Sequence, residues 1–141
     1  MSVLGDIRAG IVNNFDAFYA GTIPYNQFTG YLLTPPQPPC FEIDFPEDAL
    51  VFDIGGSDNL RLIVRGIVEL NEPDEAQQLL DEWLDNEGAT SVKAAIESDP
   101  TLGGKVANLN VTSATGHRRL GTPDGAAYLA AEWTVEVFLT P

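Results

Sequence analysis

The single cysteine and single histidine of this chain, Cys40 and His117, are the two residues that together could form a nucleophile and its base. A thiol becomes a good nucleophile when a neighbouring base removes its proton, so this chemistry needs the two side chains in contact. The local sequence favours other roles. Cys40 opens an apolar strand, where a free cysteine is usually a small buried side chain. His117 lies in a turn-prone stretch, where we expect an exposed imidazole. We predict no catalytic residue and no enzymatic activity.

Metal and phosphate binding also lack their usual residue patterns. A zinc site takes several cysteine or histidine ligands, so here it would depend on carboxylates. The acidic stretch 53–58 lacks the alternating oxygen ligands of a calcium loop. Neither Gly55-Gly56 nor Gly103-Gly104 has the Gly-Lys-Ser/Thr ending of a phosphate-binding loop. We therefore predict no metal ion and no cofactor.

Aromatic and basic residues offer candidates for contact with a partner. Residues 20–39 form an extended aromatic and proline-rich loop in this prediction, and the loop contains Tyr25, Phe28 and Tyr31. These three rings either fold back onto the core of their own chain or anchor a partner. Arg118-Arg119 is the one adjacent basic pair. It is either a solvated loop tip or the counterpart of an acidic face on a neighbouring copy.

The charge balance excludes several kinds of partner. Seven basic residues face 21 acidic ones, so the net charge is −14 and the pI is near 4.1. Such a field repels phosphate backbones and anionic membranes, and no apolar run reaches the length that spans a bilayer. An acidic run with no basic residue among its members forms either a solvated face or the lining of a channel. Its candidate residues are Glu72, Asp74, Glu75, Asp81, Glu82 and Asp85.

Hydrophobic periodicity predicts three helices that must position these residues. Apolar residues at three- and four-residue spacing predict helices over 3–19 and 71–87, with Gly88 as the stop of the second. Thr90 or Ser91 is expected to cap a short third helix through residue 98. Pro100 ends that helix, and a Gly-Gly pivot then leads into a strand.

Alternating apolar residues predict four strands in a single mixed or antiparallel sheet, with helices packed on it. The order is α-β-β-α-α-β-β, the fold class is α+β, and residues 1–141 form one domain. Residues 46–59 and 116–124 are turn-rich. The second strand has apolar residues on both faces, so we expect it in the centre of the sheet. The four strands cover residues 40–45, 60–70, 105–113 and 126–139.

Across nearly its whole length the chain resembles the tail terminator (tail completion) proteins of long-tailed bacteriophages. The resemblance includes the opening helix 3–18, the proline-rich lead into strand 40–45, and strand 60–70 followed by an acidic helix. It also includes the segment Ala95-Ile96-x-x-Asp99-Pro100-Thr101-Leu102-Gly103-Gly104. The closing strand, from Tyr128-Leu129-Ala130-Ala131-Glu132-Trp133 to Val137, completes it. The long aromatic loop departs from compact members of that family.

The resemblance implies a structural virion protein without a cofactor. It implies a homo-hexameric ring of α/β subunits that caps the polymerised tail tube, ends its elongation and joins the tail to the neck and head. Its partners would be the tail tube protein and a neck or head-completion protein, and DNA would pass through the acidic ring without specific binding. The protein would be assembled in the host cytoplasm and lie at the tail-neck junction of the virion. Two alternatives stay open: a neck adaptor or stopper on the portal side, and an acidic binding module that mimics DNA.

Overall fold

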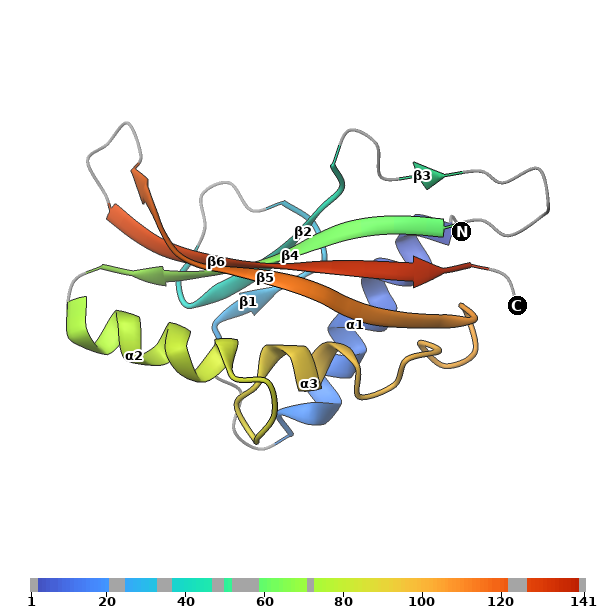
Figure 1. Cartoon of the computed structure of the whole chain (residues 1–141), viewed down its shortest axis with the longest axis horizontal. Helices are drawn as coiled ribbons and strands as arrows, with labels where there is room; N and C mark the ends of the chain where they lie inside the picture. The colour runs from blue at the N-terminus through green and yellow to red at the C-terminus, as the bar shows by residue number, and fades with distance from the viewer. Residues whose placement is uncertain are drawn as a thin grey trace.

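The fold combines one mixed β-sheet with three helices, and the helices lie together on one side of the sheet (Figure 1). The structure, a computed structural model, describes residues 3–20, 25–32, 37–46, 50–51, 59–70, 73–121 and 127–139. The α+β class and the single sheet with helices packed on it are therefore confirmed.

The sheet has a main path of five strands in the order β1-β2-β4-β6-β5, and β3 pairs with β4 beside that path. β1 and β2 are parallel, and all other neighbours are antiparallel. β4 lies between β2 and β6, which confirms its predicted central place. The strands are β1 (Gln27–Phe28), β2 (Cys40–Asp44), β3 (Leu50–Val51), β4 (Asn59–Glu69), β5 (Asn108–Gly121) and β6 (Ala127–Phe138).

The predicted count of four strands and the predicted order of elements are wrong. β1 and β3 are additional strands of two residues each, and they enter the order before β2 and before β4. Two residues are too few to show an alternating pattern, so periodicity cannot detect them. β1 also lies within the segment 20–39 that the sequence predicts to be a loop, and it forms because β2 offers it a parallel edge.

The three helices are α1 (Val3–Phe18), α2 (Pro73–Leu84) and α3 (Val92–Ile96). α2 ends three residues before the predicted Glu87, while 71 and 72 lie outside the described residues. Ser91 caps α3, as one of the two predicted residues: its hydroxyl accepts a hydrogen bond from the Ala94 N–H at 3.1 Å. The same hydroxyl donates to the Asp85 carbonyl at 2.6 Å, so this cap also holds the chain between α2 and α3.

The core lies between the helices and the face of the sheet that they cover. Alternate side chains of β4 and β6 point to this face and are buried, as period-two patterning requires. Phe15 of α1, Trp83 of α2 and Ile96 of α3 contribute fully buried side chains from the helix side. β4 has Gly66 where a Cβ would come within 2.8 Å of the Phe41 ring and 2.9 Å of Trp83. The missing side chain thus makes room for two aromatic rings.

The segment that follows α3 is fastened to α1 by a buried asparagine. The Asn14 side-chain amide donates to the Ile96 and Asp99 carbonyls, each at 3.0 Å. The Asp99 carboxylate accepts hydrogen bonds from the N–H groups of Thr101 and Gly103, at 3.4 and 2.9 Å. Gly103 and Gly104 have positive φ angles, 71° and 90°, which suits the predicted Gly-Gly pivot. The segment turns the chain from α3 toward β5.

β5 is longer than the sequence predicts, and this moves two candidate groups. The strand continues to Gly121 through pairing with β6, with irregular register between Val111 and Ser113 and between Thr115 and Arg118. His117 has a positive φ of 57°, so the second irregularity places a turn-like backbone conformation within the strand. The prediction of a turn at His117 and Arg118-Arg119 is therefore wrong. The chain as far as Gly121 belongs to β5, because pairing with β6 outweighs the local preference for a turn.

Candidate functional site

The face of the sheet opposite the helices carries rows of side chains that cross several strands. Register places Glu42 of β2, Arg65 of β4, Glu132 of β6 and Thr115 of β5 in one such row. These residues alternate with the buried core positions of their strands, so their side chains share the face without helices. We call this surface the open face.

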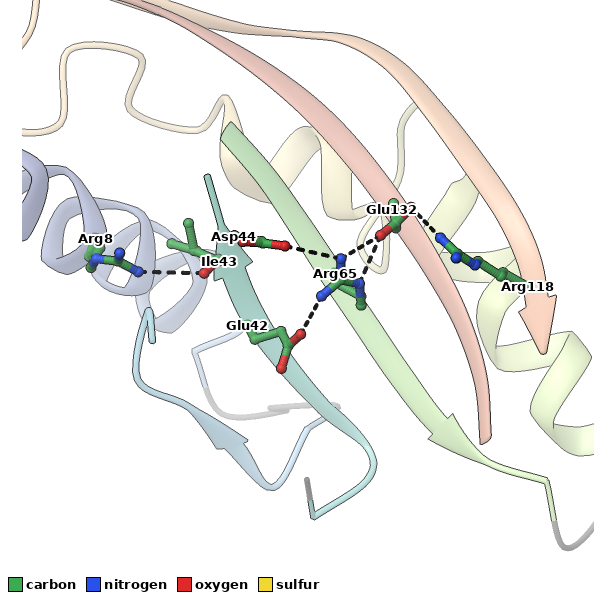
Figure 2. A network of polar contacts seen from close by, with 7 residues as sticks. All are labelled: Arg8, Glu42, Ile43, Asp44, Arg65, Arg118 and Glu132. Atoms are coloured by element: carbon green, nitrogen blue, oxygen red, sulfur yellow. Dashed lines mark hydrogen bonds and ion pairs between the residues drawn. The ribbon is translucent and has the colours of Figure 1, made fainter. Parts of the chain in front are cut away.

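An ion-pair cluster centred on Arg65 occupies the middle of the open face, and Figure 2 shows its members converging from the neighbouring strands β2, β4, β6 and β5. The Arg65 guanidinium donates to Glu132 at 2.8 Å from Nε and lies 2.7 Å from it through Nη2. It also donates to Glu42, and Asp44 lies 3.5 Å from Nη2. Arg118 reaches Glu132 from β5 at 3.5 Å. One guanidinium thus holds carboxylates from β2 and β6 on either side of β4.

Burial and charge act in opposite directions on Arg65. Burial lowers the pKa of the guanidinium, but hydrogen bonds and attraction from Glu132 and Glu42 outweigh it, so the pKa is raised above its ordinary value. Arg65 stays charged at every ordinary pH. The Glu42 residue is 6% exposed, which means that its carboxylate depends on nearby donors rather than on water. The cluster therefore links three strands electrostatically and resembles no proton-transfer site.

Arg8 of α1 forms a second cationic contact, with two aromatic rings. Its guanidinium carbon lies 4.5 Å from the ring centroids of both Tyr31 and Phe45. Arg8 also donates to the carbonyl of Gly30. It donates to the Ile43 carbonyl at 3.4 Å as well (Figure 2). Tyr31 is 56% exposed. Of the three aromatic candidates, Tyr31 is the one whose ring stays available to a partner.

Tyr25 and Phe28 fold back onto their own chain, which is one of the two alternatives that the sequence left open. Phe28 is 8% exposed, and its ring centroid lies 4.7 Å from that of Phe15. Tyr25 packs edge-on against Phe41 at 5.5 Å, and its hydroxyl donates to Asp16 at 2.8 Å. Burial and that hydrogen bond raise the Tyr25 pKa. These two rings complete the core in place of an interface.

The basic pair lies at the edge of the sheet rather than at a loop tip. Among the described strands, β5 has a neighbour on one side only, and all residues from 112 to 119 are exposed. Neighbouring strand residues point to opposite faces, so Arg118 reaches Glu132 on the open face and Arg119 points to the other side. Within the described part of the chain, Arg119 forms no ion pair.

The described acidic candidates lie on α2 and directly after it. Asp74, Glu75, Glu82 and Asp85 are exposed, and among the described residues none of them forms an ion pair. Asp81 differs because its carboxylate lies 2.8 Å from Nε2 of His117 on β5. Glu72 lies outside the described residues.

Cys40 and His117 are not brought together. They lie on β2 and β5, with β4 and β6 between them, which corresponds to about 14 Å across three strand spacings. Cys40 is fully buried beside Ile67 and Ala130, and burial raises the pKa of its thiol to about 11. His117 contacts Asp81 instead. The thiol–imidazole pair that the sequence could have offered does not form.

Two concave regions of the described chain bear on ligand binding. A groove of about 520 Å³ lies on the open face beside the Arg65 cluster, with Arg61, Ile63, Thr134 and Glu136 among its lining residues. A smaller one, of about 230 Å³, lies between Pro38-Pro39 and α2. Within the described residues, no group of three or more His, Cys, Asp or Glu side chains is placed to hold a metal ion. No described helix is long and apolar enough to cross a membrane.

The Arg65 cluster is the feature that sequence reasoning missed. The signal was present, since Glu42 and Asp44 alternate with apolar residues on one strand and Arg65 does so on the next. Strand order was the missing information: β4 and β6 are neighbours although their paired residues are 59 or more positions apart in the sequence, and Glu132 meets Arg65 only through that pairing. Compared with known proteins, the chain matches no protein-family model and no curated protein.

Proposed function

We propose that this protein is a structural virion subunit of the tail terminator kind, which forms a ring on the tail tube, ends tube elongation and joins the tail to the neck. DNA passes through the ring without specific binding. The proposal begins from the resemblance in element order and spacing. The observation that carries it in the structure is the exposed edge of β5, where residues 112–119 are accessible along an unpaired sheet edge.

An unpaired edge of this length is a ready surface for another chain. Edge strands of soluble proteins are usually shortened, covered or charged, because unpaired backbone groups recruit other strands. β5 is 14 residues long, although its two irregularities and its arginines restrict plain strand addition. Such an edge fits contact with a specific neighbour, as in a ring of identical subunits.

The acidic surface gives the ring a second property. A net charge of −14 per chain, repeated in every copy, repels the phosphate backbone of a genome that passes nearby. Exposed acids on α2 are well suited to that role because, among the described residues, only Asp81 contacts a basic side chain, the His117 imidazole at 2.8 Å. In this proposal the wall of the channel reduces DNA binding, and no residue forms a base-specific contact.

Electron microscopy of tails assembled with and without the protein tests the proposal. We expect tubes of uncontrolled length in its absence and tubes of uniform length, with a ring at the head-proximal end, in its presence. Tubes of normal length without the protein would overturn the terminator role. Immunogold labelling of virions adds an independent test, since the label must lie at the junction of tail and head.

Two other functions predict different outcomes. A neck adaptor or stopper would bind portal-side proteins rather than tail tube protein, so a pull-down against each separates it from the terminator. An acidic module that mimics DNA is favoured by the exposed acidic side of α2. It would act as a monomer or dimer and compete with DNA for a basic protein, and it would leave tail length unchanged.

A further inference from the structure

We propose that the subunits join head to tail, with Arg119 at the edge of β5 in one copy contacting the acidic outer side of α2 in the next. This inference rests on the proposed function, since it names the subunit contact of that ring. It begins from a charge asymmetry along the chain. No acidic residue lies between Asp99 and Asp124, and this stretch contains Lys105, Arg118 and Arg119.

Arg119 is the exception among the seven basic residues, all of which lie in the described ranges. Arg8 stacks on two rings, Arg65 and Arg118 bind Glu132, and Arg61 has a partner. Lys93 pairs with Glu97 at 2.7 Å and Lys105 lies 3.9 Å from Asp6. Arg119 is exposed and has no ion pair in the described part of the chain. In a chain with three times as many acids as bases, this cation is available to a second molecule.

The acidic counterpart is a stripe on α2. Glu75 and Glu82 are spaced by seven residues, so they lie on one side of the helix, and Asp85 directly follows Leu84, the last residue of the helix. All three are exposed, and none forms an ion pair within the described residues. The opposite side of α2 is buried through Ala76, Leu80 and Trp83. Glu82 and Asp85 are therefore open to solvent or a neighbour, whereas Glu75 also lines the groove beside Pro38-Pro39.

The two surfaces differ in kind and direction, which determines the symmetry. A contact between unlike surfaces is heterologous, and it produces rings or filaments rather than a closed two-fold dimer. β5 lies at the edge of the sheet, whereas α2 packs on the face that the helices cover (Figure 1). A contact between a sheet edge and a helix on the covered face relates successive copies by a rotation in this proposal, and such a rotation closes into a ring.

Charge-swapped variants test the contact in the full-length chain. Arg119→Glu alone and the double variant Glu82→Lys/Asp85→Lys alone should each weaken self-association about tenfold or more, measured by light scattering at low salt. Mixing these two variants should restore assembly, because each supplies the surface that the other lacks. Arg119→Lys should assemble almost as the wild type does.

Matched controls separate folding from contact. Circular dichroism must show unchanged secondary structure in each variant, and Ala17→Lys/Ala20→Lys adds positive charge at exposed positions near the end of α1. That control should leave assembly unchanged. Equal affinity of self-association in the wild type and in both charge-swapped variants would overturn this contact and leave the ring proposal standing. A wild type that stays monomeric at high concentration and low salt would also overturn it, while tail length would still decide the proposed function.

Discussion

Glu42 and Arg65 face one another across β2 and β4, and their ion pair lies at the centre of the open face with only 6% of Glu42 exposed. Glu132 completes the arrangement from β6. A charge so little hydrated depends on its partner, and removal of one member is more costly than the pair itself is favourable. One guanidinium on β4 thus holds carboxylates from both neighbouring strands, β2 and β6.

Replacing Arg65 should strongly destabilise the fold. In Arg65→Met, Glu42 loses the Arg65 guanidinium and Glu132 keeps only Arg118. We expect about 3 kcal/mol lower free energy of unfolding in urea titration. Arg65→Lys keeps the charge but loses the planar fork, so its loss should be smaller. Adding Glu42→Gln to Arg65→Met should recover part of the loss. Equal stability of Arg65→Met and the wild type would show that the cluster contributes nothing.

Gly66→Ala should disturb the aromatic part of the core. The new Cβ would lie 2.8 Å from Phe41 and 2.9 Å from Trp83, both fully buried, so neither ring can move easily. Overpacking of this kind costs about 1–3 kcal/mol, which thermal unfolding can measure. Gly121→Ala is the matched control, because nothing lies within 4 Å of a Cβ there. Similar melting temperatures for the two variants would contradict the close approach.

Asn14→Ala should loosen the segment between α3 and β5. The change removes two hydrogen bonds from a side chain that is 6% exposed, and leaves the Ile96 carbonyl without this donor. We expect a loss of about 2 kcal/mol and faster amide hydrogen exchange over residues 96–104. Asn13→Ala, at an exposed neighbouring position, should change neither quantity. Unchanged exchange in Asn14→Ala would mean that the two bonds do not hold this segment.

The Cys40 thiol should be nearly unreactive in the folded chain at pH 8. Burial raises its pKa from the ordinary 9.0 to about 11, so the thiolate is scarce as well as inaccessible. Labelling with iodoacetamide should be slow until urea unfolds the chain. Because the folded state keeps the proton while the unfolded chain releases it, this thiol should lower stability as pH rises from about 9 to 11. Cys40→Ala should show a shallower decline over that window, and rapid labelling of the native wild type would refute the prediction.

Elements with a long, regular pattern were predictable from local residues. The helix at 3–18, the central strand 59–69 and the strand 127–138 follow from apolar periodicity, and Ser91 follows from the hydrogen-bonding preference of a helix cap. The two-residue strands β1 and β3 were not predictable, because they exist only where β2 and β4 present an edge. The extension of β5 through His117 was not predicted for a related reason. Gly116 indicates a turn in the sequence, and only the pairing with β6 carries the strand past the positive φ of His117.

The amino-acid sequence by itself determined the net negative charge, the acid-free stretch around Arg118 and Arg119, and the burial pattern of each long strand. Tertiary structure alone decided which charges meet. Arg65 is 67 residues from Glu132 and 23 from Glu42, and only the order β2-β4-β6 brings all three into contact. The same order separates Cys40 from His117 and leaves Arg119 at an edge. Periodicity reports which face a residue occupies, but backbone pairing between distant segments determines its neighbours on that face.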